Sequence, residues 1–139
     1  MKTQLDVLDY FKYSSLQALD FKKVLLIDSN PIIAQQLSKM ITKLNHLSLG
    51  FACNLKKIEQ RIAVKQPDYI IINLATQGEF DGYQMAKILK LDYEIPFAIL
   101  LKDNSISQQK WADELNPDGK IIYSNDDSLL LNQIGNVLV

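Results

Sequence analysis

The apolar residues of this chain fall into short continuous runs that alternate with longer segments of helical spacing. The run Tyr69–Ile72 is entirely apolar and rich in β-branched residues, which predicts a strand buried on both faces. Comparable runs predict four further strands, at residues 24–27, 47–52, 96–101 and 119–123. Apolar residues at helical spacing predict helices at about 31–44, 54–64, 83–91 and 105–115, and a last helix capped by residues 124–127.

Strands that alternate with helices indicate an α/β fold. Right-handed crossovers between parallel strands place the helices on both faces of one sheet, so we expect a doubly wound, five-stranded parallel sheet. The alternating pattern begins near residue 21, and the length of 139 residues suits one such domain. We therefore expect one domain at residues 21–139, preceded by an extension at residues 1–20.

Residues 1–20 carry apolar side chains near helical spacing, which predicts an extra N-terminal helix. The apolar residues include Leu5, Leu8 and Phe11, with Asp6, Asp9 and Lys12 between them. Three interpretations stay open: a helix packed on its own domain, a helix that docks on a partner or dimerises, and a disordered arm. Phe11 is a candidate interface residue under the second interpretation.

Composition narrows the classes of function. The formal net charge of −1 gives no strong field that would attract nucleic acid or an anionic membrane. No apolar run approaches the roughly 18 residues of a membrane span, and no leader precedes the domain, so we expect a cytoplasmic protein. Cys53 is the only cysteine, which excludes an internal disulfide and a zinc–cysteine cluster, and its apolar surroundings predict a core position.

Polar residues stand where two predicted strands end. Asp28 and Ser29 follow the first strand, and Asn73 follows the third. In an open parallel sheet, ligands bind at the carboxyl ends of the strands, so these residues occupy the place where a site is expected. The Asn73 amide is a poor nucleophile and a neutral ligand. We expect Asp28, with Ser29 in the same cap, to interact with the start of the following helix.

From about residue 21 onward, the chain resembles the receiver domain of two-component response regulators. The resemblance is carried by Asp28 with Asn30-Pro31, by Pro67-Asp68, by Asp81-Gly82 and by Ile95-Pro96, in that order and spacing. It implies a sheet with strand order 2-1-3-4-5. It also implies a site in which an aspartate ending the third strand accepts a phosphoryl group. Two acidic residues after the first strand help to hold Mg²⁺, and a hydroxyl and a lysine end the fourth and fifth strands.

This sequence departs from the family at nearly every one of these positions, and only Asp28 of the acidic pair is acidic. Asn73 stands at the phosphoacceptor position and Asp28-Ser29 at the acidic pair, while Leu101 and Tyr123 stand at the hydroxyl and lysine positions. An amide cannot form an acyl phosphate, and one carboxylate holds Mg²⁺ poorly. We therefore expect a degenerate phosphorylation pocket, with no bound metal, no cofactor and no catalytic residues.

These departures favour a pseudo-receiver that is not an enzyme and that binds a signalling protein, an output domain or a second copy of itself. The alternative is a domain that senses a small molecule in the emptied pocket. A small enzyme has little support, because no glycine-rich phosphate loop follows a strand. In receivers the usual partner surface includes the helix and strand that carry Trp111 and Tyr123 here, so both are interface candidates.

Overall fold

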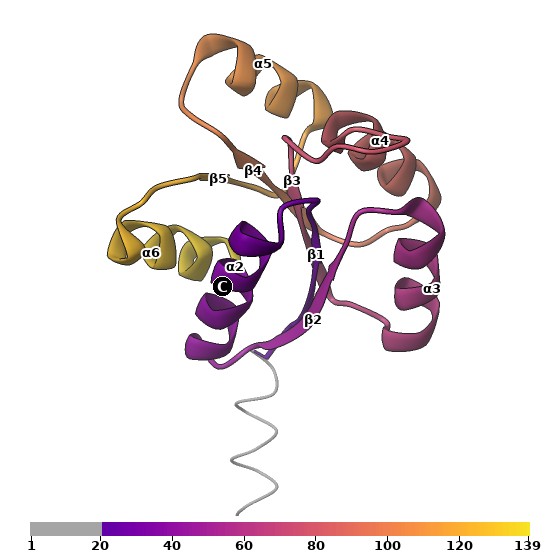
Figure 1. The fold of residues 1–139 in the computed structure, drawn as a ribbon, viewed down its shortest axis with the longest axis horizontal. Helices are drawn as coiled ribbons and strands as arrows, with labels where there is room; N and C mark the ends of the chain where they lie inside the picture. The colour runs from indigo at the N-terminus through magenta and orange to yellow at the C-terminus, as the bar shows by residue number, and fades with distance from the viewer. Residues whose placement is uncertain (1–20) are drawn as a thin grey trace, which may run out of the picture.

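The computed structural model describes residues 21–139, which form a five-stranded parallel sheet with helices on both faces (Figure 1). The strands are β1 (Lys23–Ile27), β2 (Leu47–Ala52), β3 (Tyr69–Asn73), β4 (Phe97–Leu101) and β5 (Gly119–Ile122). Their order is β2-β1-β3-β4-β5, so the predicted topology is confirmed. The extension at residues 1–20, with Phe11, lies outside the described residues.

The helices follow the strands in the predicted alternation. They are α2 (Pro31–Lys43), α3 (Leu55–Lys65), α4 (Gly82–Asp92), α5 (Ile106–Leu115) and α6 (Asp127–Val137). Figure 1 shows α2 and α6 on one face of the sheet and α3, α4 and α5 on the other. Most predicted bounds lie within one residue of the observed ones.

Successive strand residues enter two separate apolar cores, one on each face of the sheet. On β1, Leu25 and Ile27 pack in the core beneath α3, α4 and α5, whereas Val24 and Leu26 pack in the core beneath α2 and α6. Side chains alternate between the two faces of a strand, so a sheet covered on both faces needs apolar residues at every position. This requirement explains the uninterrupted apolar runs of the sequence.

Short polar side chains fix where the helices begin. The Asn30 side chain accepts hydrogen bonds from the N–H groups of Ile32 and Ile33, and Pro31 occupies the first turn of α2. Asp81 and Gln84 form a reciprocal capping box at the start of α4. These local bonds explain why the predicted helix starts agree with the structure.

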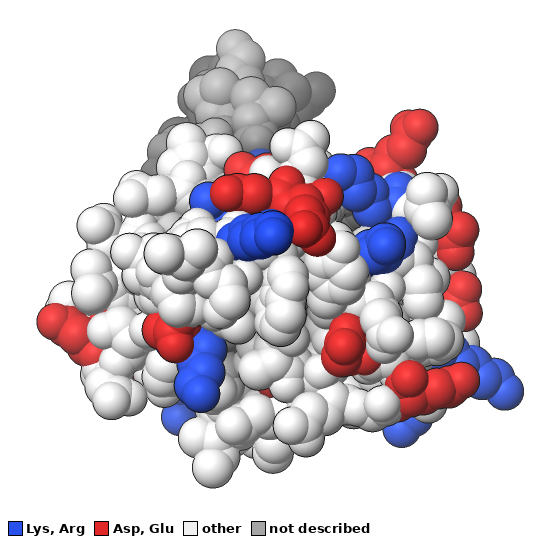
Figure 2. Space-filling view, turned by 90° about the horizontal axis from the view of Figure 1, so that it is seen from above, with Lys and Arg blue, Asp and Glu red and all other residues white. Residues whose placement is uncertain are grey.

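The charged side chains nearly balance in sign, with a formal net charge of −1. Figure 2 shows acidic and basic side chains interspersed over a largely uncharged face. Cys53 is exposed, so the predicted core position is wrong; β2 ends at Ala52, and Cys53 begins the turn into α3. Among residues 21–139, no helix has the length and apolar character needed to cross a bilayer.

Candidate functional site

The neighbouring strands β1 and β3 bring Asp28 and Asn73 together at the carboxyl edge of the sheet. Ile27 pairs with Ile72, so the residues that follow them are adjacent. Asp28 is 1% exposed and Asn73 is 6% exposed. The Asn73 Nδ2 group donates a hydrogen bond of 3.1 Å to Asp28 Oδ2. The two residues that the sequence placed at this edge therefore form a buried amide–carboxylate pair.

The second carboxylate oxygen of Asp28 is also hydrogen-bonded. Its Oδ1 accepts a 2.8 Å bond from the backbone N–H of Asn30, which confirms the predicted interaction with the start of α2. Burial raises the pKa of the Asp28 carboxyl above its ordinary value, whereas the bonds from Asn30 and Asn73 oppose that rise. Each oxygen of the carboxylate thus has a protein donor.

Thr76 is a third buried polar residue of the site, and sequence reasoning did not assign it a role. Its side chain is 1% exposed, and its Oγ1 lies 2.7 Å from the carbonyl oxygen of Asn73 and 3.3 Å from that of Ile27. The hydroxyl therefore ties the ends of β1 and β3 together. The only signal in the sequence was a threonine three residues beyond a strand end, which is too common to identify such a bond.

The loop between β3 and α4 closes over the same edge. Ser29 Oγ accepts a 3.0 Å bond from the N–H of Gln77, so this side chain contacts the loop between β3 and α4. That Ser29 also shares the cap of Asp28 stays a prediction. A Cβ on Gly82 would contact the Asn73 carbonyl oxygen and would lie 2.6 Å from the Leu74 carbonyl oxygen. Only glycine fits this close approach of α4 to the end of β3.

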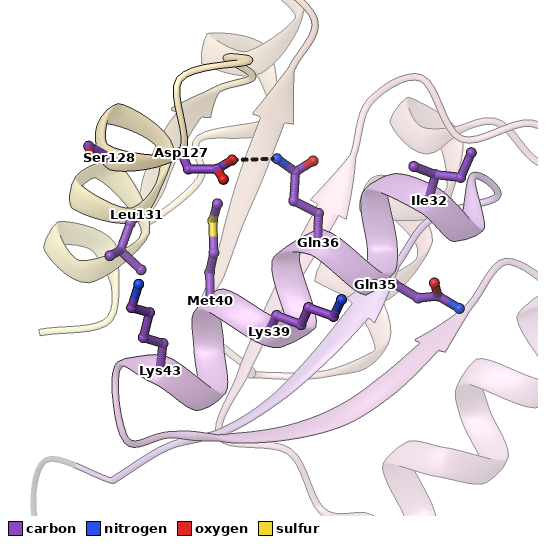
Figure 3. A pocket seen from close by; sticks show the side chains of 9 residues that line it. All are labelled: Ile32, Gln35, Gln36, Lys39, Met40, Lys43, Asp127, Ser128 and Leu131. Carbon is purple, nitrogen blue, oxygen red and sulfur yellow. Dashed lines mark hydrogen bonds between the residues drawn. The ribbon is translucent and has the colours of Figure 1, made fainter.

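Leu101 and Tyr123 belong to opposite faces of the sheet. Leu101 is fully buried in the core beneath α3, α4 and α5, whereas the half-buried Tyr123 packs against the core beneath α2 and α6. The Tyr123 hydroxyl donates to Gln36 Oε1 at 3.1 Å. Gln36 Nε2 in turn donates to Asp127 Oδ1 at 3.1 Å, the bond drawn in Figure 3. The hydrogen bonds of the site thus join Asp28, Asn73 and Thr76, while Tyr123 is bonded to α2.

This arrangement has little capacity for phosphoryl or metal chemistry. The Asn73 side chain offers no carboxylate to attack a phosphoryl group. Within residues 21–139, no three histidine, cysteine, aspartate or glutamate residues are grouped so that they could hold a metal ion. The residues present do not fit Mg²⁺, because Asp28 belongs to no such group and a single carboxylate holds this ion poorly.

The fold is that of response-regulator receiver domains. The signal receiver domain of a modulated diguanylate cyclase from Desulfovibrio desulfuricans G20 is 19% identical, with a TM-score of 0.69 over 85% of this chain and 94% of that one. The BeF3-activated N-terminal receiver domain of Klebsiella pneumoniae RstA is 17% identical, with a TM-score of 0.70 over 84% and 97%. The receiver domain of the Francisella response regulator 1452 is 23% identical, with a TM-score of 0.66 over 84% and 95%. No family model and no curated protein matches the sequence.

Proposed function

We propose that this receiver-fold chain is a degenerate receiver domain, which acts in signal transduction as a protein-interaction or dimerisation module independently of phosphorylation. The observation that carries the proposal is the hydrogen bond from the Asn73 amide to Asp28. Asn73 occupies the strand end where the family resemblance implies the phosphoacceptor. A carboxamide forms no acyl phosphate. Here its N–H group donates to the Asp28 carboxylate and offsets part of that negative charge.

The internal bonding of the site supports the same proposal. Asp28, Asn73 and Thr76 are almost fully buried, and each of them bonds to the protein itself. A phosphoryl group or a hydrated cation would have to break these bonds and pay the cost of leaving their donors unpaired. The second hypothesis from the sequence is a small molecule bound in the emptied pocket. The hydrogen bonds within the site do not favour it, and it stays a prediction.

The outer surface of α5 is the partner surface that we favour. Trp111 is 47% exposed on this helix, and Ile106 is more exposed still. Lys120 of β5 bonds to this helix, at 3.0 Å to Asp113 and 2.8 Å to Gln109. A large aromatic side chain exposed on a helix suits a binding anchor. Tyr123 suits this role less well, because its ring is half-buried and its hydroxyl already bonds to Gln36.

Treatment of the full chain with acetyl phosphate and Mg²⁺ tests the proposal. We expect the intact mass to stay unchanged, because residue 73 offers no carboxylate to the donor. We also expect the sedimentation behaviour, alone or with a partner, to be the same with and without the donor. A labile phosphate adduct that maps to residues 73–81, or association that requires the donor, would contradict the proposal.

A further inference from the structure

A groove runs between α2 and α6 on the outside of the molecule (Figure 3). Its upper part has a volume of about 470 Å³ and is lined by Ile32, Gln36, Lys39, Met40 and Lys43 of α2 and by Leu131 of α6, among others. A second hollow, lined by Leu44 and Gly135, shares Ser128 and Leu131 with the first. The two hollows therefore form one continuous surface, which we call the α2–α6 groove.

The side chains of the α2–α6 groove define the chemistry of its occupant. Met40 and Leu131 lie along the middle, and Ile32 is 77% exposed at the upper end. Lys39 and Lys43 line the α2 side, and neither ammonium group is paired with a carboxylate of residues 21–139. An amphipathic segment with an apolar stripe and an acidic edge would match this surface.

The chain enters the described fold beside the lower end of this groove. The N–H of Lys22 donates to Nδ1 of His46 at 3.0 Å, and the carbonyl of Lys22 accepts from the N–H of Leu47 at 3.0 Å. His46 lies two residues after Leu44, which lines the lower hollow. Phe21, the first described residue, is an exposed aromatic side chain. Residues 1–20 therefore join the fold within a few residues of the groove.

The sequence of residues 1–20 has the required pattern. At the helical rotation of about 100° per residue, Leu5, Leu8, Leu16 and Leu19 fall on one stripe, and Asp6, Asp9 and Asp20 fall along one edge of it. A helix of 20 residues would be about 30 Å long, whereas the 13 residues of α2 span about 20 Å. The segment is thus long enough to cover the length of α2.

We infer that the α2–α6 groove is a helix-binding surface and that its occupant is the segment 1–20 of the same chain. The leucine stripe covers Met40, Leu131 and Ile32, and the acidic edge of the segment lies on the side of Lys39 and Lys43. This inference does not depend on the proposed function, because it concerns neither phosphorylation nor the surface of α5.

Carbodiimide cross-linking of the full chain tests this inference, because the reagent joins carboxylates to amines only when they are in contact. An equal mixture of unlabelled and isotope-labelled chains distinguishes links within one chain from links between chains. We expect peptide mapping to find links from Asp6, Asp9 or Asp20 to Lys39 or Lys43, within one chain. Lys56 and Lys57 of α3, on the opposite face of the sheet, are the internal comparison.

A matched pair of variants separates docking from general effects. Ile32 and Ile106 are both exposed isoleucines in the first turn of a helix, but only Ile32 lines the groove. Ile32→Asp should lower the yield of the links to Lys39 and Lys43 severalfold, and Ile106→Asp should leave it unchanged. Links only between labelled and unlabelled chains would assign the groove to a second copy and overturn the inference. The absence of links, or an equal spread over all lysines, would overturn it as well.

Discussion

Two regions differ in the environment of their side chains: the carboxyl edge of the sheet, and the outer surfaces of α2, α5 and α6. At the edge, Asp28, Asn73 and Thr76 are buried and hydrogen-bond within the protein. On the outer helices, Ile32 and Trp111 expose apolar surface that nothing among residues 21–139 covers. The polar side chains of the edge therefore find their partners among residues 21–139, whereas Ile32 and Trp111 expose apolar area to which these residues contribute no cover.

This difference predicts opposite consequences of mutation in the two regions. A substitution at the edge leaves a buried group unpaired or creates overlap, which lowers the free energy of unfolding. A substitution of an exposed apolar side chain changes that free energy little and acts on association instead. Three experiments test the contrast, beginning with the largest expected effect.

Gly82→Ala should be the most damaging of the three changes. The added methyl group would overlap the carbonyl oxygens of Asn73 and Leu74, which are backbone atoms and cannot move aside independently. We expect a loss of about 3 kcal/mol in the free energy of unfolding, measured by urea denaturation. Gly135→Ala is the control: its Cβ would meet Leu44 at 3.5 Å, an ordinary contact, so a neutral or slightly stabilising effect is expected. Equal effects of the two variants would show that α4 does not pack tightly on the edge.

Asn73→Asp should destabilise the chain by about 2 kcal/mol at pH 7, because it replaces a donor to Asp28 with a second carboxylate. The same change at exposed Asn132 is the control and should have little effect.

The loss caused by Asn73→Asp should depend on pH. Burial already raises the pKa of the Asp28 carboxyl, and a neighbouring carboxylate would raise it further. The folded variant then holds more protons than the unfolded chain, so its stability falls as pH rises through the raised pKa. Urea denaturation should therefore show the full deficit at pH 7 and a smaller one as pH falls toward the ordinary carboxyl value of about 4. A deficit that is the same at both pH values would argue against charge repulsion.

Trp111→Ala should have the smallest effect on stability, within about 0.5 kcal/mol, because nearly half of the side chain is in water. Its expected effect is on association: self-association or capture of a partner should weaken markedly in sedimentation or light-scattering experiments. Leu91→Ala, which removes an exposed apolar side chain from α4, is the comparison and should leave association unchanged. A large loss of stability with unchanged association would place Trp111 among the structural residues.

The sequence by itself determined the architecture of residues 21–139 and the presence of an amide, not a carboxylate, at the end of the third strand. Strands buried on both faces must be apolar at every position, and Asn30 and Asp81 cap helices through bonds to residues two or three positions away. Such features are local, so they can be read along the chain. The position of Asn73 at a strand end is equally local, and it excludes an acyl phosphate whatever the surroundings.

Only the tertiary structure decided what the polar residues of the edge contact. Thr76 reaches the carbonyl of Ile27 across 49 residues, and Ser29 bonds to Gln77 across 48. Gln36 and Asp127, 91 residues apart, connect α2 and α6 beside the groove. These pairs depend on the order of the strands, on which face each side chain takes and on the path of a loop. Spacing along the sequence cannot predict these pairs, because the sheet brings together residues that are far apart in the chain.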